Sequence, residues 1–164
     1  MKYSIVVVGD ELLIGQVVDT NSGWIARHLR PYGWTAQSVK VVADDAHEIT
    51  RAIDQAFADT DVVLMTGGLG PTKDDITKAT LCRYFGGEMV LSEATLRNVE
   101  EVLGKRGLQM NPLNHNQAMV PSSCQVIQNT VGTAPLMWFE RDGKVLVSMP
   151  GVPFETEAMM RSAV

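Results

Sequence analysis

The sequence predicts an α/β fold, a three-layer α/β/α sandwich around a mostly parallel sheet with a β-hairpin near the carboxyl end. Short β-branched runs alternate with amphipathic stretches along the chain, the pattern of βαβ units with right-handed crossovers. The runs "YSIVVVG" and "DVVLM" are apolar throughout, as expected of strands that helices cover on both faces. Late in the chain, Arg141-Asp142-Gly143 between two such runs predicts a tight hairpin.

The first half of the chain predicts three strands with helices between them. The stretch Asn21–Tyr32 predicts a helix that ends at Gly33. Its inner side carries Ile25, Leu29 and Tyr32. Asp45, with Glu48 three residues later, indicates the start of the next helix through an acidic variant of the capping box. That helix buries a stripe at Ile49, Ala52, Ile53, Ala56 and Phe57. The predicted strands are Tyr3–Gly9, Trp34–Val42 and Asp61–Met65.

The second half predicts three more helices and three more strands. One helix runs over Ile76–Phe85 and is closed by Gly86-Gly87; the next starts at Ser92 and ends before Gly107. We expect Met110–Pro121, which is rich in amides, to be a polar loop or a short helix. The strands are "CQVIQN", "LMWFE" and "KVLVSM". Pro153 suits the first turn of a final helix.

Composition limits the classes of function. At 164 residues the chain has the length of one domain, so we expect a single domain over residues 1–164. The net charge of −5 disfavours a nucleic-acid partner, which would need clustered Lys and Arg. No apolar run reaches the ~18 residues that span a bilayer. The start, "MKYSIVVVGDELL", is a poor signal peptide, so we expect a cytoplasmic protein.

Four loops are expected to form one site. In a parallel sheet, ligands bind beyond the carboxyl ends of the strands. This rule brings together the loops Gly9–Asn21, Ala43–Asp45, Thr66–Asp75 and Pro150–Glu155.

The loop "GGLGPTKDD" follows a strand and is rich in glycine. It fits neither the P-loop nor the dinucleotide fingerprint, because Lys73 occupies the position of the last glycine in both. Gly67, Gly68 and Gly70, followed by Pro71, still favour a concavity of backbone N–H groups that binds an anion. The alternative is that these glycines only make a tight βα turn.

Two acids, Asp74 and Asp75, end this loop. One of them can cap the following helix, but a second carboxylate would repel a phosphate unless a cation lay between them. Mg²⁺ commonly uses one or two carboxylates together with phosphate oxygens. We therefore hypothesise that acids at this edge hold a metal or orient a water molecule. Asp10, Glu11 and Asp44 also follow strands, although turns favour Asp for structural reasons alone.

Five ordered motifs carry a resemblance to a known family. They are "GDELLIGQVVDTNS", "TGGLGPTKDDIT", "NHNQAMVP", "VGTAP" and "PGVPFE". Together they resemble the amino-terminal domain of the competence-damage-inducible protein CinA family, within the wider molybdopterin-binding (molybdenum cofactor biosynthesis) fold. The resemblance implies assembly into dimers or trimers and a metal-dependent ADP-ribose pyrophosphatase activity. We expect the metal to be a divalent cation, Mg²⁺, Mn²⁺ or Co²⁺. Long members also contain a nicotinamide mononucleotide deamidase domain. We do not expect that activity of residues 1–164.

The resemblance also implies functional residues. Asp44 and Asp75 match the family's catalytic and metal-binding aspartates, whereas Leu69 and the added Asp74 depart from the pterin-binding relatives and favour the CinA-like function. Asn21, Asn114 and Gln117 are candidate ribose or base contacts, or simple loop-stabilising amides. The full set of expected ligand-binding residues is Gly9, Asp10, Glu11, Asn21, Gly67, Gly68, Gly70, Pro71, Thr72, Asp74, Asn114, Gln117, Gly132, Thr133, Pro150, Gly151 and Glu155.

Three functions stay open on the sequence. The first is hydrolysis of ADP-ribose to AMP and ribose 5-phosphate. The second is binding of molybdopterin or another pterin phosphate, as in molybdenum cofactor biosynthesis. The third is a non-catalytic domain that supports oligomerisation or ligand binding.

Overall fold

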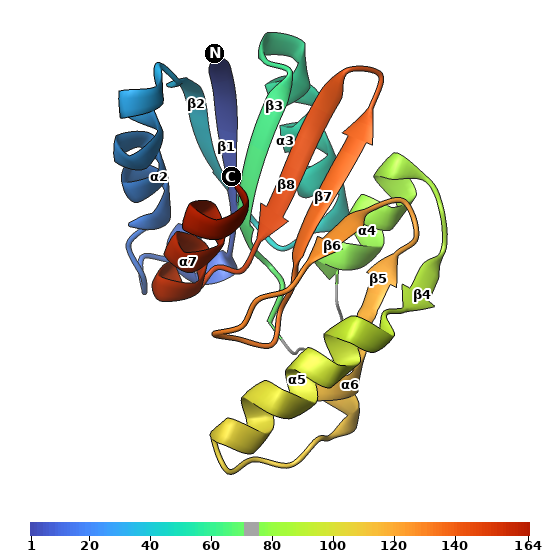
Figure 1. The fold of residues 1–164 in the computed structure, drawn as a ribbon. Helices are drawn as coiled ribbons and strands as arrows, with labels where there is room; N and C mark the ends of the chain where they lie inside the picture. Colours follow the sequence, from blue (N-terminus) through green and yellow to red (C-terminus); the bar gives the residue numbers. More distant parts are fainter. Residues whose placement is uncertain (71–75) are drawn as a thin grey trace.

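The computed structural model describes residues 1–70 and 76–164. Of the expected site residues, Pro71, Thr72, Asp74 and Asp75 lie outside the described residues. The main sheet has the strand order β2 (Thr35–Val42), β1 (Lys2–Val8), β3 (Val62–Gly67), β8 (Lys144–Met149), β7 (Leu136–Arg141) and β6 (Gln125–Ile127) (Figure 1).

The first four strands of that order are parallel, and β7 runs antiparallel to β8. Asp142 (φ 52°) and Gly143 (φ 76°) form the turn between β7 and β8. Two consecutive left-handed residues match the right-handed twist of a hairpin, so the expected tight turn is confirmed. Strand β6 pairs antiparallel with β7 at the edge of the sheet.

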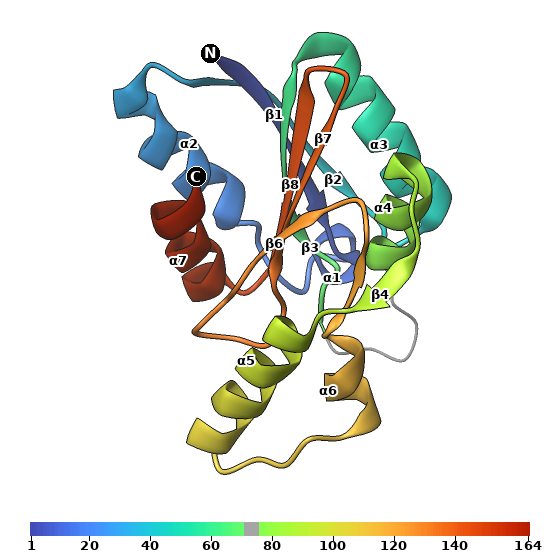
Figure 2. The same cartoon turned by 45° about the vertical axis from the view of Figure 1, so that its right-hand side comes forward.

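Helices cover both faces of this sheet (Figures 1 and 2). On one face lie α2 (Asn21–Leu29) and α7 (Pro153–Ala163), and on the other lie α3 (Ala46–Asp59) and α4 (Ile76–Phe85). The predicted three-layer α/β/α architecture with a mostly parallel sheet is therefore confirmed.

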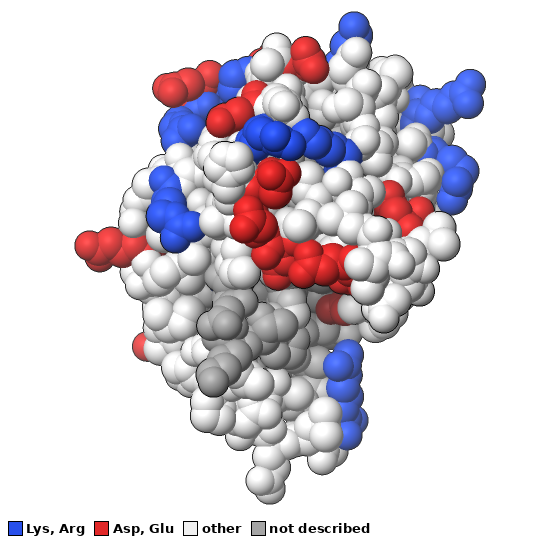
Figure 3. Space-filling view, turned by 180° about the vertical axis from the view of Figure 1, so that it is seen from behind, with Lys and Arg blue, Asp and Glu red and all other residues white. Residues whose placement is uncertain are grey.

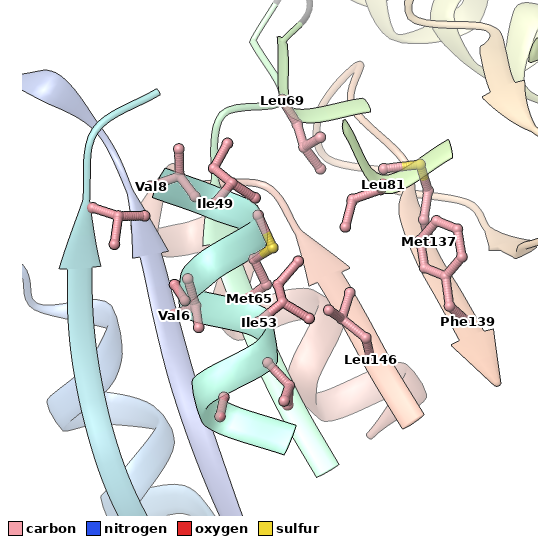
Figure 4. Packing of buried hydrophobic residues seen from close by; sticks show 14 of the residues in the cluster. Val6, Val8, Ile49, Ile53, Met65, Leu69, Leu81, Met137, Phe139 and Leu146 are labelled. Carbon is pink, nitrogen blue, oxygen red and sulfur yellow. The ribbon is translucent and has the colours of Figure 1, made fainter. Parts of the chain in front are cut away.

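The two faces bury separate apolar clusters because side chains alternate along each strand. Val6, Val8 and Met65 point toward Ile49 and Ile53 of α3, as Figure 4 shows. Tyr3, Ile5 and Val7 point the other way, toward α2 and α7. The stripe predicted for α3 is buried throughout, and Asp45 caps the helix by accepting a hydrogen bond from the Glu48 N–H.

A smaller unit, residues 89–121, leaves the main sheet between α4 and β6, and we call it the excursion. It contains β4 (Met89–Leu91), α5 (Glu93–Lys105), α6 (Pro112–Asn116) and β5 (Met119–Pro121). Strands β4 and β5 pair antiparallel in a two-stranded sheet of their own. In Figures 1 and 2, α5 and α6 lie beyond the carboxyl ends of the parallel strands.

Several elements differ from the sequence-based expectations. Residues Asp10–Leu13 form a single helical turn, α1, where a loop was expected. The predicted stretch 110–121 contains strand β5 as well as the short helix α6. Tyr32 was placed on the inner side of a helix, but it is 70% exposed. Pro31 has no N–H to continue the helix, so α2 ends at Leu29 and a 3₁₀ turn, Arg30–Tyr32, carries Tyr32 outward.

Among the described residues, no helix has the length and apolar character that crossing a lipid bilayer requires.

Candidate functional site

The carboxyl ends of β1 and β3 open into a cleft of about 310 Å³. Its floor is the glycine loop with Gly67, Gly68 and Gly70, and Gly151 of the loop after β8 lies beside it. Glu11 and Asn21, two further expected ligand residues, also line this cleft. Of the four loops that were expected to form one site, three contribute residues to this cleft, and the loop Ala43–Asp45 does not.

The close packing at this floor requires glycine. Gly67 has φ 89°, and a Cβ atom there would lie 2.2 Å from the backbone oxygen of Val8. A Cβ atom on Gly151 would lie 2.9 Å from the Gly67 Cα atom, so the two loops touch through their main chains. Gly68, with φ 72°, has Thr77 of α4 against it. Glycine thus lets two loops and a helix start converge where a ligand would sit.

Backbone donors are available on the same loop. Within residues 1–70 and 76–164, no group accepts a hydrogen bond from the N–H of Leu69 or of Gly70. An added Cβ atom on Gly70 would meet none of the described atoms within 4 Å, so the described residues leave the space in front of Gly70 open. N–H groups in such a loop, near the first turn of a helix, are suited to an anion.

Asn21 holds the two sides of the cleft together. Its side chain is buried, and its Nδ2 atom donates to the backbone oxygen of Gly151 at 2.9 Å. The start of α2 is fixed next to it, because Asp19 accepts hydrogen bonds from the N–H and the hydroxyl of Ser22. Asn21 therefore positions the loop after β8 in addition to lining the cleft.

A second, smaller cavity of about 100 Å³ adjoins the cleft and shares Leu69, Gly70 and Gly151 with it. We call it the small pocket; it is also lined by Gln117, Thr133 and Glu155, and by Pro150. Gln117 comes from the excursion, and its Nε2 atom donates to the Leu69 oxygen at 3.0 Å. The excursion thus supplies a wall next to the glycine loop.

Glu155 is buried in the first turn of α7, with 7% of its surface exposed. Its Oε1 atom accepts a hydrogen bond from Asn129 Nδ2 at 2.7 Å. Burial raises the pKa of this carboxyl, while the Asn129 hydrogen bond and the charge of Arg106 act in the opposite direction. Gly132 is required beside it, because a Cβ atom there would lie 1.5 Å from Glu155 Oε1.

Asp10, after β1, and Asp44, after β2, lie outside both cavities but close to each other, whereas Glu11 lines the cleft. The Asp44 N–H donates to Asp10 Oδ1 at 3.1 Å, and Asp44 Oδ1 accepts from the Thr77 hydroxyl at 3.0 Å. Because Thr77 also packs against Gly68, Asp44 is linked to the glycine loop through one side chain. Among the described residues, no group of three His, Cys, Asp or Glu side chains forms a metal site.

Acidic side chains lie together on the face seen in Figure 3, with basic ones around them. A phosphate approaching from this side meets negative charge, so its binding depends on main-chain donors or on a cation.

The structure does not bring every expected residue to the cavities. Gly9 lies at the end of β1 and donates its N–H to the Val42 oxygen. Asn114 accepts from the Asn111 N–H in a capping box at α6 and lines neither cavity. Asp10 and Asp44 are near the loop without lining either cavity.

Sequence reasoning missed the apolar walls of the cleft. Val17 and Val18, 52% and 79% exposed, line it together with Leu12 and Val152. The apolar pairs and triplets "LLI" and "VV" in the stretch "GDELLIGQVVDTN" were the available signal. Thr66 was also missed: it lines the cleft, and its buried hydroxyl has no hydrogen-bond partner among the described residues.

Comparisons with known proteins agree with this architecture. The probable molybdopterin binding domain model matches residues 4–164. A CinA-like protein from Cytophaga hutchinsonii is 47% identical over 95% of this chain, and one from Flavobacterium psychrophilum is 44% identical over 100%. The chain spans 37% and 40% of the length of these two relatives.

Solved structures of CinA and of a cofactor-synthesizing protein are also similar to this chain. CinA from Thermoplasma acidophilum, described as a protein of unknown function, superposes with a TM-score of 0.87 at 35% identity, over 98% of this chain and 94% of that one. The tungsten cofactor synthesizing protein MoaB from Pyrococcus furiosus gives a TM-score of 0.61 at 21% identity, over 98% and 90%, and shares the fold. The chain therefore belongs to the probable molybdopterin-binding domain family, and its sequence places it with the CinA-like members.

Proposed function

We propose that this chain binds a small phosphorylated ligand through the main chain of residues 67–70. The observation that carries the proposal is the pair of N–H groups at Leu69 and Gly70, which have no acceptor within the described residues. In front of Gly70 the described residues also leave open space. Membership of the family favours a pterin phosphate, with the ring between the apolar walls of the cleft. This main-chain mode of binding also suits a protein with a net charge of −5.

A second candidate function is hydrolysis of the phosphoanhydride bond of ADP-ribose, which yields AMP and ribose 5-phosphate. The observation that favours it is the pair of carboxylates, Asp10 and Asp44, next to Thr77 and the glycine loop. Two carboxylates meet the usual protein contribution to a Mg²⁺ site, in which phosphate oxygens and water supply the other ligands. In the proposal, Asp44 and Asp75 hold a divalent cation such as Mg²⁺, Mn²⁺ or Co²⁺. Asp10, whose Oδ1 atom accepts a hydrogen bond from the Asp44 N–H, is the further carboxylate next to Asp44.

In this second candidate function, different residues have different roles. The loop amides hold the pyrophosphate, and Thr77 orients the Asp44 carboxylate through their hydrogen bond. The apolar walls around Val17, Val18 and Val152 shield one ring of the bound ADP-ribose from water. A bound cation would lower the pKa of a water molecule and offset charge on the leaving phosphate.

One assay separates the candidates. Purified protein is incubated with ADP-ribose and Mg²⁺, Mn²⁺ or Co²⁺ while AMP release is followed, and retention of molybdopterin is measured in parallel. Asp44→Asn should reduce AMP release by about a hundredfold. Asp45→Asn is the matched control, because its side chain only caps α3 and Asn caps equally well.

The outcomes are distinct. AMP release that depends on Asp44 supports the hydrolase, and molybdopterin retention without turnover supports the pterin function. If neither ligand binds, the phosphate-binding proposal is wrong and a non-catalytic role is left. Assembly into a dimer or trimer is part of the proposal, and sedimentation equilibrium measures it directly.

A further inference from the structure

One side chain that lines the small pocket, Gln117, carries a buried acceptor without a partner among the described residues. Gln117 is 2% exposed, and its Oε1 atom has no hydrogen-bond partner within the described residues. Its other amide atom, Nε2, donates to the Leu69 oxygen, and this bond fixes which way the amide faces. An unpaired buried carbonyl costs stability, so a partner supplied by a ligand would recover free energy.

A second acceptor, Glu155, lines the same pocket. Its carboxylate is held by Asn129, and Asn129 is itself buried and donates to the Ala134 oxygen as well. The position of Glu155 is therefore set by a hydrogen-bonded pair and not by a flexible side chain. Gly132 leaves the room that this pair needs.

We propose that the small pocket is a specificity subsite for a part of the ligand that presents O–H or N–H hydrogen-bond donors. Gln117 Oε1 and the Glu155 carboxylate are the acceptors, and Leu69 connects this subsite to the phosphate-binding loop. The inference rests on the proposed function, because it assigns the other end of the same ligand.

The side chains that line the pocket disfavour a phosphate as its occupant. No Lys or Arg of the described residues lines it, and two acceptors would repel phosphate oxygens. Its volume of about 100 Å³ equals the space of about three water molecules, which suits one edge of a ring or the hydroxyls of one sugar. The larger cleft of about 310 Å³ is left for the bulk of the ligand.

Two sources present such donors next to a phosphate. One is the pair of hydroxyls on the terminal ribose of a nucleoside diphosphate sugar. The other is the amino group and ring N–H of a pterin. Both satisfy two neighbouring acceptors, so the experiment must test each one.

The test measures binding of two matched ligand pairs by calorimetry in the presence of Mg²⁺. The first pair is the methylene-bridged analogue of ADP-ribose, which cannot be hydrolysed, and the same molecule without the 2- and 3-hydroxyls of its terminal ribose. The second pair is a pterin phosphate and the matching lumazine phosphate, in which an oxygen acceptor replaces the amino donor. In one pair, the donor-bearing ligand should bind at least about tenfold more tightly.

The variant Gln117→Leu should abolish that difference in affinity by weakening only the donor-bearing ligand. Gln128→Leu is the matched control. Gln128 also has a partly buried amide whose oxygen has no partner among the described residues and whose Nε2 donates, to Thr95, but it lines neither cavity. Gln128→Leu should therefore keep the tenfold preference of the native protein.

Three results overturn the inference. If the native protein binds both members of each pair equally, the subsite does not exist, while the proposed phosphate binding survives. If Gln117→Leu weakens both members equally, Gln117 acts only by supporting the glycine loop. If the native protein binds none of the four ligands, the proposed function and this inference are both wrong. The comparison within the native protein needs no variant, so it remains decisive if Gln117→Leu does not fold.

Discussion

The main sheet and the excursion are held together in different ways. In the main sheet, apolar side chains such as Val63 and Leu64 are fully buried between helix layers. The excursion buries fewer apolar side chains, and they belong to neither main cluster: Val99, Val102, Leu103, Ala118 and Val120. Its β4 strand is exposed at every residue.

Polar side chains join the excursion to the rest of the molecule. Lys78 of α4 is 2% exposed, and its Nζ atom donates to the oxygens of Asn116 and Met119 at 2.7 and 2.8 Å. Gln117 bonds to Leu69, and Asn98 bonds to the Asn129 oxygen. The difference indicates that the main sheet sets stability, whereas a few directional bonds set how the excursion meets the site.

The largest expected effect is a clash in the main sheet. Gly67→Ala places a methyl group 2.2 Å from the Val8 oxygen at φ 89°, and it should lower the free energy of unfolding by about 4 kcal/mol. Gly107→Ala, in the excursion, has φ 68° and nothing within 4 Å, so it should cost about 1 kcal/mol. Urea denaturation of both variants measures the difference; equal losses would show that the left-handed backbone alone is responsible.

The same truncation should cost more in the main sheet than in the excursion. Val63→Ala removes methyl groups from a side chain with 0% exposure and should lower the free energy of unfolding by about 2 kcal/mol. Val90→Ala, on β4 with 39% exposure, should cost under about 1 kcal/mol. Thermal unfolding followed by circular dichroism gives both values. A larger loss for Val90→Ala would contradict the contrast between the two regions.

Lys78→Met tests the polar connection directly. It leaves two carbonyl oxygens of the excursion without their Nζ donor, and we expect a loss of about 2 kcal/mol. Hydrogen exchange should accelerate in residues 112–121 and stay unchanged in β1 and β3. Lys105→Met, on the exposed side of α5, is the control and should change stability by less than about 0.5 kcal/mol. Equal exchange in both regions would mean that the excursion unfolds only with the main sheet.

Glu155→Gln should have the smallest effect, and it should be a gain. Burial raises the folded-state pKa of Glu155 above the ordinary 4.5, so above pH 4.5 the unfolded state loses its proton first and stability falls as pH rises. Gln carries no proton to lose and keeps an oxygen for Asn129. The variant should melt up to about 3 °C higher at pH 8 and equally at pH 4. A lower melting temperature at pH 8 would show that the carboxylate charge is stabilised in place.

The main sheet could be predicted from the sequence because its signals are local. The apolar runs of β1 and β3 and the helical spacing of α3 are each contained in one short segment. Helix α4 ends at the predicted residue, Phe85. The need for glycine at the strand ends could also be predicted, because it too is a local signal. The contact between Gly67 and Gly151 could not be predicted from the sequence.

The candidate site was only partly predictable. Gly67, Gly68, Gly70 and Gly151 line the cleft, and Gln117, Thr133 and Glu155 line the small pocket. Asn114 was indistinguishable from Gln117 as an amide in the same loop, yet it caps α6. Composition shows that amides are present, but only the path of the excursion decides which of them reaches Leu69.

By itself the sequence determined the strand and helix order, the parallel sheet and the glycine turn after β3, because burial and backbone conformation leave periodic patterns and glycines in the residues themselves. The tertiary structure alone decided the pairing of β4 with β5, the separation of a large cleft from a small pocket, and the unpaired Gln117 oxygen. These features depend on contacts between segments far apart in the chain, as between Leu69 and Gln117, and a three-residue strand is too short to leave a pattern of its own.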